Sequence, residues 1–253
     1  MTEPQPFIFD VHLDLSMNAM EWNRDLTQPL EKIRICEANQ TDKPDRSMGT
    51  VCLPEMRKGN VGLCVATQIA RYTKQKNPLP GWHSPAQAWA QSQGQLSWYN
   101  EVERQGELTQ ICNLEQLESH LEKWSTGQNK QLPIGYVLSL EGADSIITLQ
   151  HLESAYEKGL RAIGPAHYGP GTYAPGTGES GPLGNGATEL LREMERLNII
   201  LDVTHLSDTS LDQALDTFSG TVWASHCNCR TLVPGERQLN DHQLKRLIER
   251  GGV

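Results

Sequence analysis

The sequence Phe7-Ile8-Phe9-Asp10-Val11 is a short apolar run that leads directly into the polar pair His12 and Asp14. Continuous rather than alternating apolarity is typical of a strand that is covered on both faces. Residues two apart on a strand point to the same side, so His12 and Asp14 are predicted to lie next to each other. The run therefore predicts a buried strand with a polar site at its carboxyl end.

Similar apolar runs recur along the chain and are separated by segments with helical periodicity. The predicted strands are 61–66, 134–140, 160–163, 199–203 and 221–224. The predicted helices are 149–158, 188–197 and 241–250, and 101–124 is predicted to be mostly helical with an interruption near Gly106. Strands that alternate with helices indicate a parallel sheet. The predicted fold class is α/β, and a (β/α)8 TIM-type barrel is favoured over an open doubly wound sheet. Residues 1–253 are predicted to form a single domain of this kind.

Each later run is followed by a side chain that can bind a metal. Glu141 follows 134–140, His167 follows 160–163, His205 follows 199–203 and His226 follows 221–224. In a parallel barrel these strand ends meet on the face where active sites are built. A single histidine at a strand end is usually structural, and a lone His-x-Asp pair is weak evidence. A set repeated at successive strand ends is much more specific.

Imidazole and carboxylate ligands suit zinc, although manganese or iron would also accept them. His12 and Asp14 are predicted to hold one ion, and His205 and His226 a second. A carboxylate such as Glu141 can bridge two cations. Two ions about 3.5–4 Å apart can share a water molecule and acidify it to hydroxide near neutral pH.

The chain resembles the membrane dipeptidase (renal dipeptidase) family, peptidase family M19 of the amidohydrolase superfamily. The resemblance follows the order of the family's motifs over nearly the whole chain. It rests on Asp10-Val11-His12-Leu13-Asp14-Leu15, on 53–62, on Ser139-Leu140-Glu141-Gly142, on 159–163 with His167, on 181–184, on 193–197, on 201–207, on Ser225-His226 and on 237–241.

The resemblance implies a role for each site residue. His12 and Asp14 would bind the first Zn²⁺, Glu141 would bridge both ions, and His205 and His226 would bind the second. His167 would contact the substrate and polarise the scissile carbonyl, with Glu141 as the other catalytic residue. Arg237 would hold the terminal carboxylate of the substrate, for which a guanidinium is well suited. The implied reaction is hydrolysis of a dipeptide amide bond by a metal-bridging hydroxide.

Members of the family continue beyond the motif at 237–241 and carry a later acidic residue that shuttles protons. Nothing in this sequence matches that part, because the chain stops at Val253, where a seventh strand is expected. The expectation is a C-terminally incomplete barrel, which is a fragment or is completed by another chain. Two alternatives to a dipeptidase therefore stay open: an amidohydrolase that acts on another small amide or lactam, and a catalytically inert fragment.

Composition narrows the function classes. The formal charge of -9 argues against a nucleic-acid surface, which needs clustered Lys and Arg. No apolar stretch approaches the roughly 20 residues that span a bilayer, and the start of the chain does not resemble a leader. The six cysteines form no Cys-x-x-Cys pair, which favours free thiols and a cytoplasmic location. The expected partner is a dipeptide or small amide, and a homodimer stays open.

Four weaker signals have simpler interpretations. Residues 176–181 fit the letters Gly-x-Gly-x-x-Gly, but no strand precedes them, so 168–184 is expected to be a flap rather than a nucleotide site. Cys227 and Cys229 flank His226 and are expected to be small buried thiols. Asp202 is expected to support the site or the fold. The remaining histidines are expected to be solvated; they are His83, His120, His151 and His242.

Overall fold

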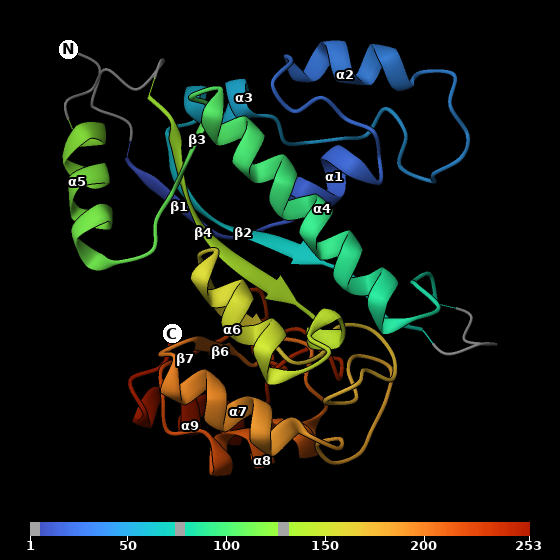
Figure 1. Cartoon of the computed structure of the whole chain (residues 1–253), viewed down its shortest axis with the longest axis vertical. Helices are drawn as coiled ribbons and strands as arrows, with labels where there is room; N and C mark the ends of the chain where they lie inside the picture. Colours follow the sequence, from blue (N-terminus) through green and yellow to red (C-terminus); the bar gives the residue numbers. More distant parts are fainter. Residues whose placement is uncertain (1–5, 74–78, 126–131) are drawn as a thin grey trace. The chain divides into compact units, whose positions relative to one another are not determined.

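The computed structural model describes residues 6–73, 79–125 and 132–253 (Figure 1). The first five residues, on which the expectation about a leader mainly rests, lie outside them. The chain divides into two compact units. Unit 1 comprises Met1–Thr67 and Gln95–Leu138, and unit 2 comprises Gln68–Gly94 and Ser139–Val253. The prediction of a single domain stays a prediction.

Unit 1 contains parallel strand pairs, and its first strand is largely exposed, so the prediction that this strand is buried on both faces is wrong. Strand β1 (Ile8–Leu13) pairs with β2 (Val61–Ile69), with Asp10 opposite Cys64, and β3 (Leu108–Gln110) pairs with the start of β4 (Ile134–Glu141). The helices that begin and end in this unit are α1 (Leu15–Met20), α2 (Leu30–Glu37), α3 (Leu53–Lys58) and α5 (Leu114–Ser125). Helix α4 (Pro85–Arg104) begins in unit 2 and ends in unit 1.

The core of unit 1 is organised around two buried tyrosines. The rings of Tyr99 and Tyr136 stack with centroids 5.2 Å apart. The Tyr99 hydroxyl donates a hydrogen bond to Thr67 O at 2.8 Å and accepts one from Ser16 N at 3.2 Å. These bonds satisfy a polar group that would otherwise be costly to bury, so the α1 start, β2 and α4 are fixed together.

The predicted interruption of the helical segment 101–124 near Gly106 is confirmed, but the strand that follows it was not predicted. Gly106 adopts a left-handed φ of 78° and ends the run of α4, and Leu108 then enters the sheet beside Ile134. The chain becomes helical again only at Leu114. A three-residue strand carries too little periodicity to be seen in the sequence. Because β3 was missed, the strand at 222–223 is the seventh described strand rather than the sixth.

One histidine expected in solvent also differs. His120 of α5 is buried, and its Nε2 lies 2.7 Å from Gly62 O. Burial lowers the pKa of His120, although the hydrogen bond with Gly62 opposes this shift. A Cβ on Gly135 would lie 2.7 Å from the same ring nitrogen, so the small residue makes room for the imidazole.

Unit 2 follows the predicted alternation of strand and helix. The end of β4 is followed in the sheet by β5 (Leu160–Gly164), β6 (Ile200–Asp202) and β7 (Val222–Trp223), and the β5–β6 and β6–β7 pairs are parallel. The α-helices within this unit are α6 (Leu149–Glu157), α7 (Ala187–Arg196), α8 (Asp208–Thr217) and α9 (Asp241–Glu249), with a short 3-10 helix η2 (Ala143–Ser145).

The helices of unit 2 cover the sheet with the faces that the sequence indicates. Helix α7 packs against β6 and α8, and it buries Leu190, Leu191 and Met194 on one stripe. Helix α9 begins with a capping box between Asn240 and Gln243, which leaves Asp241 in its first turn. Across the described ranges, no helix has both the length and the apolar character of a membrane span.

Candidate metal centre

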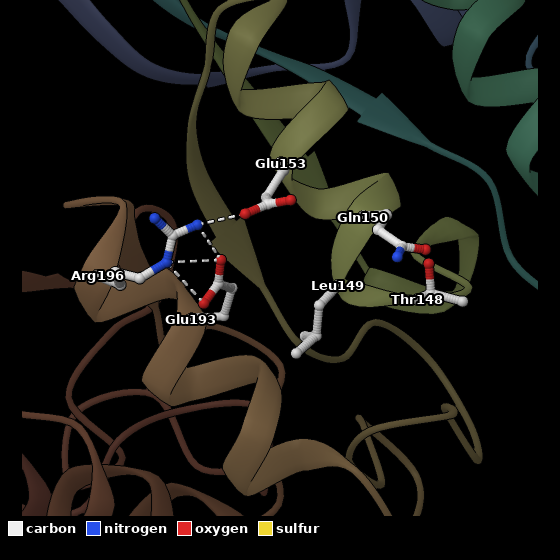
Figure 2. Close-up of a pocket in the computed structure, with 6 residues that line it drawn as sticks. All are labelled: Thr148, Leu149, Gln150, Glu153, Glu193 and Arg196. Carbon is white, nitrogen blue, oxygen red and sulfur yellow. Dashed lines mark hydrogen bonds and ion pairs between the residues drawn. The ribbon is translucent and has the colours of Figure 1, made fainter.

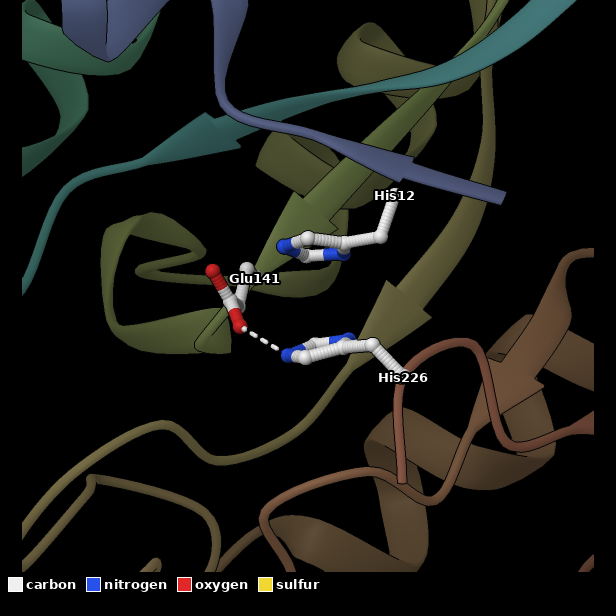
Figure 3. A group of neighbouring side chains, drawn as sticks. All are labelled: His12, Glu141 and His226. Atoms are coloured by element: carbon white, nitrogen blue, oxygen red, sulfur yellow. Dashed lines mark ion pairs between the residues drawn. The ribbon is translucent and has the colours of Figure 1, made fainter. Parts of the chain in front are cut away.

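Three predicted metal ligands meet in unit 2 where strands end. Glu141 is the last residue of β4, and His205 and His226 follow β6 and β7. Glu141 Oε1 lies 3.0 Å from His205 Nε2 and 3.3 Å from His226 Nε2, and the two imidazole nitrogens are 3.2 Å apart. Figure 3 shows the ion pair between Glu141 and His226. Glu141 and His205 are buried.

His205 reaches this position through an unusual backbone conformation. Its φ is 70°, a left-handed value that is uncommon for a residue other than glycine. The chain turns sharply directly after β6, and Leu206 N donates to Val203 O at 3.3 Å. Such strained residues cluster at functional sites, where the surrounding structure holds them in place.

The contacts of His205 are compatible with a lone pair on Nε2 when a cation is bound there. Arg237 Nη2, which can only donate, lies 3.3 Å from Nε2, and the Glu141 carboxylate 3.0 Å from the same atom would otherwise accept a proton from it. With the lone pair on Nε2, the proton of the neutral ring is on Nδ1 and is donated to Thr177 Oγ1 at 2.8 Å. Burial lowers the pKa of His205 although Glu141 opposes the shift, which favours the neutral ring that binds metals.

His226 is oriented in the same way by a different hydroxyl. Ser225 Oγ donates its one proton to the carboxylate of Asp202, so it can only accept from His226 Nδ1, which is 2.8 Å away. The Nε2 atom of His226 is left with a lone pair. Histidine ligands of metals commonly donate their other N–H in this manner, either to a carboxylate or through a further group. The expectation that Asp202 supports the site agrees with this contact.

In the tautomers with Nδ1 protonated, three atoms with lone pairs face one another. They are Glu141 Oε1, His205 Nε2 and His226 Nε2, at mutual distances of 3.0 to 3.3 Å. Ligands about 2.1 Å from one ion at tetrahedral or right angles would be about 3.0–3.4 Å apart. The spacing and the lone pairs fit a shared cation, so the residues present suit a metal ion.

His167 lies at the border of this centre. It follows β5, and its Nε2 is 3.8 Å from Glu141 Oε2. Glu141, His167 and His205 form a group whose ligand atoms lie within 4.8 Å of one another and could hold a metal ion. Distance alone thus allows His167 either the predicted contact with substrate or a place among the ligands.

Arg237 supplies a free cationic donor beside the imidazoles. Its Nη2 donates to His226 O at 2.9 Å, whereas Nη1 is buried with no hydrogen-bond partner among the described residues. A buried donor without a partner costs about 1–3 kcal/mol, so it indicates a ligand that completes it. An anionic group such as a carboxylate has the matching chemistry.

His12 and Asp14 belong to unit 1, where the structure brings them together as the sequence predicts. His12 Nε2 lies 3.4 Å from Asp14 Oδ1, and Asp14 accepts a hydrogen bond from Thr67 Oγ1 on β2. Both side chains are partly exposed, by 13% and 28%. An imidazole and a carboxylate at this spacing are suitable ligands for one ion. Their participation in a metal centre with Glu141 stays a prediction.

Two other features of unit 2, the cysteines after His226 and a cavity between α6 and α7, are less suited to binding a metal ion. Cys227 and Cys229 are partly rather than fully buried, which corrects the expectation for them, and burial raises the pKa of the Cys227 thiol to about 11. A cavity of about 400 Å³ between α6 and α7 is lined by Thr148, Leu149, Gln150, Glu153, Glu193 and Arg196 (Figure 2). Its only cation, Arg196, is already paired with Glu193 and Glu153, and the lining contains no histidine or cysteine.

Sequence reasoning missed two residues that orient the ligands, Thr177 and Ser225. Thr177 lies in the loop 168–184, which contains no helix or strand, and it is 28 positions from the histidine that it contacts. Ser225 directly precedes a predicted ligand, and that position was the one available signal. Neither hydroxyl belongs to a spacing pattern that predicts a metal site.

Comparisons with known proteins place the chain in a family. The family model described as membrane dipeptidase (peptidase family M19) matches residues 4–253. The crystal structure of dipeptidase AC, a metallopeptidase of family M19, superposes with a TM-score of 0.75 at 21% identity and covers 98% of this chain and 70% of that one. A Rhodobacter sphaeroides metallopeptidase, solved with a phosphinate mimic of L-Ala-D-Ala, gives 0.75 at 20% identity over 99% and 73%.

Among curated proteins, dipeptidase tcpJ of Claviceps purpurea (strain 20.1) is 30% identical over 127 residues, which is 47% of this chain and 30% of that protein. The chain thus matches less than a third of that relative's length. The structural similarity confirms the predicted fold class, α/β of the partial TIM-type barrel kind. The family match extends over nearly the whole chain and agrees with the strand-end pattern of histidines and carboxylates. The chain belongs to the membrane dipeptidase family, peptidase family M19.

Proposed function

We propose that the protein is a zinc-dependent dipeptidase and that this chain carries its metal ligands and its carboxylate-binding arginine. The observation that supports this most strongly is the set of lone-pair atoms on Glu141, His205 and His226, at the spacing of ligands on a common ion. Family membership and the metallopeptidases of similar fold point to the same class of reaction. The Rhodobacter relative is described with a mimic of a dipeptide that ends in a D-residue, so such dipeptides are included in the proposed substrates.

The proposed centre holds two Zn²⁺ ions, although other divalent metals suit the same ligands. His12 and Asp14 bind one ion, His205 and His226 the other, and Glu141 contacts both, as the family resemblance implies. When bound, the ions supply an acidified water and polarise the substrate carbonyl. Ser225 and Thr177 hold the imidazoles with their Nε2 lone pairs toward Glu141.

The substrate is oriented by the free donor on Arg237. Its Nη1 atom binds the terminal carboxylate of the dipeptide, and Nη2 stays bonded to His226 O. This clamp places the scissile amide beside His167 and Glu141. His167 donates a hydrogen bond to the amide oxygen, on which negative charge develops as the carbonyl carbon is attacked.

The proposal is tested with the full-length protein. Zinc content is measured by elemental analysis, and turnover is measured on dipeptides with L- and D-residues at the C-terminus. We expect bound zinc and hydrolysis that stops when a chelator removes the metal. A protein that binds no divalent metal and hydrolyses no dipeptide would refute the proposal.

The main competing function is hydrolysis of a different small amide or lactam. Arg237→Met separates the two, because it removes the donor but keeps much of the side-chain volume. A dipeptidase should lose much more turnover of free dipeptides than of substrates without a carboxylate, for which only the contacts of Arg237 with His205 and His226 are lost. Arg192→Met, on the exposed surface of α7, is the matched control. Cyclic amides that are turned over faster than any dipeptide would favour the competing function.

A further inference from the structure

His167 differs from the two proposed ligands in the group that contacts its Nδ1 atom. The contact comes from Arg71 Nη2, at the exit of β2, and it is a close hydrogen bond. A guanidinium has no acceptor, so Nδ1 of His167 must accept this bond. The neutral ring therefore carries its proton on Nε2, the atom that lies 3.8 Å from Glu141 Oε2.

This is the opposite tautomer from that of the other two imidazoles. His205 and His226 each have a hydroxyl at Nδ1 and a lone pair at Nε2. His167 has a cation at Nδ1 and an N–H at Nε2, and an N–H cannot coordinate a metal. Although its distances allow His167 to be a third ligand beside Glu141 and His205, its hydrogen bond does not.

We propose that Arg71 is a positioning residue that holds His167 in the Nε2–H tautomer, as a hydrogen-bond donor to the substrate amide rather than a metal ligand. The substrate role of His167 rests on the proposed function, whereas the tautomer rests on the contact with Arg71. No proton is transferred in this role: His167 donates a hydrogen bond to the carbonyl oxygen and keeps the proton. Arg71 adds a fixed positive charge behind the ring, which strengthens the donor.

Arg71 itself is held rigidly by the segment that follows β2. Its Nη1 donates to Pro80 O at 2.8 Å, and its backbone carbonyl accepts from Trp82 N at 2.8 Å. Thr73 N donates to Trp82 O at 2.8 Å, which completes a short parallel bridge. A Cβ on Gly81 would lie 2.6 Å from Thr73 Cγ2, so only glycine fits this close approach.

A buried carboxylate holds the same segment from the other side. Asp144 of η2 accepts hydrogen bonds from Tyr72 N at 3.3 Å and from Thr172 N at 2.6 Å. Its negative charge also attracts the Arg71 side chain. Asp144 therefore ties the residue after Arg71 to the loop 168–184, which also contains Thr177. The guanidinium has few alternative positions, as a residue that sets a tautomer requires.

The tautomer can be measured without any enzymatic assay. In the full-length zinc-loaded protein labelled with ¹⁵N-histidine, two-bond ¹H–¹⁵N spectra distinguish protonated from unprotonated ring nitrogens, and His167→Gln identifies the His167 signals. We expect an unprotonated Nδ1 and a protonated Nε2 in the wild type. Arg71→Met should lose this preference, Arg71→Lys should keep it because the ammonium still donates, and Arg192→Met on α7 should change nothing.

Kinetics provide the second readout. If His167 stabilises the developing oxyanion, Arg71→Met should lower kcat about 10–100-fold, with KM changed less than about threefold. This is less than the roughly 100–1000-fold loss on removing such a donor outright, because His167 itself is still present. Binding of a phosphinate dipeptide mimic should weaken in parallel with kcat, and Arg71→Lys should recover part of both. Thermal unfolding of each variant checks that the fold is intact, and Arg71→Lys keeps the test available if Arg71→Met does not fold.

The outcomes separate this inference from the proposed function. A protonated Nδ1 on His167 in the wild type, or an unchanged tautomer and kcat in Arg71→Met, would overturn the role of Arg71 even if the protein is a dipeptidase. A protein that hydrolyses no dipeptide but shows the expected tautomer and its loss in Arg71→Met would refute the proposed function while the assignment of the tautomer stands.

Discussion

Replacing Ser225 with alanine should weaken zinc binding through a residue that does not touch the metal. Ser225 Oγ connects the Asp202 carboxylate with His226 Nδ1, which is 2.8 Å away. Alanine removes this oxygen and leaves the backbone bond from Ser225 N to Asp202 Oδ1, 3.3 Å long, in place. The change therefore isolates the orientation of the imidazole from the position of the strand end.

The magnitude follows from what is lost. His226 would be free to rotate or to place its proton on Nε2, and such partners of metal ligands are worth about 10–100-fold in metal affinity. This corresponds to about 1.4–2.7 kcal/mol of binding free energy. The metal-free protein should also be destabilised by about 1–3 kcal/mol, because Asp202 Oδ2 and His226 Nδ1 lose a buried partner. The two effects must be measured separately.

Zinc affinity is measured by competition with a chromophoric chelator on the full-length metal-free protein, and stability is measured by urea unfolding in excess chelator. Thr217→Ala on α8 is the control, because its hydroxyl donates only to Gln213 O at 2.7 Å, within the same helix. An affinity of Ser225→Ala within about twofold of the wild type would refute the argument from tautomers. A loss that equals the loss in Thr217→Ala would do the same.

Three further predictions concern stability and the loop at the site. Glu37→Gln should lower the free energy of unfolding by about 3–5 kcal/mol at neutral pH, because it removes the buried negative charge that pairs with both Arg24 and Arg46. Burial opposes the charge of Glu37, but bonds from Arg24, Ser47 N and Arg46 outweigh it and hold its pKa below 4.5. Its contribution is therefore complete above pH 4.5 and is lost as the pH falls through the folded-state pKa, so urea unfolding of the variant should vary less with pH in that acidic range. Gly176→Ala should destabilise unit 2 by about 1–3 kcal/mol or more and lower kcat, since its Cβ would be built 1.8 Å from His167 O; a variant with wild-type Tm and kcat would contradict this. Asn240→Ala should cost about 1 kcal/mol by removing the cap of α9, and an unchanged urea midpoint would show that the cap is not needed.

Much of unit 2 could be predicted because its strands are buried on both faces. The runs at 160–163 and 199–203 are mostly apolar, with one charged residue each, and the structure confirms strands at Leu160–Gly164 and Ile200–Asp202. Strand β3 could not be predicted, because Leu108–Gln110 has three residues and only Leu108 is fully buried. Its place in the sheet depends on pairing with Ile134, which is far along the chain, and a local sequence pattern cannot predict such a distant pairing.

The same limit applies to the site. Glu141, His205 and His226 could be chosen as ligands because strand ends in a parallel sheet converge, and the structure brings these three together. Thr177 and Arg71 could not be chosen, because each meets its histidine only through the path of a loop. The sequence alone does not distinguish His167 from His205 and His226. All three histidines follow apolar strands, and in the structure all three lie near Glu141.

What separates these histidines is the group behind each ring. A hydroxyl that can accept lets the imidazole carry its proton away from the centre, so the lone pair faces inward and can bind a cation. A guanidinium can only donate, so it forces the lone pair outward and the N–H inward, where it can serve only an electron-rich atom. We therefore infer that Thr177, Ser225 and Arg71 make the difference between two proposed ligands and one proposed donor. It follows that an exchange of the group behind the ring, rather than of the histidine, is the most direct way to move His167 between these roles.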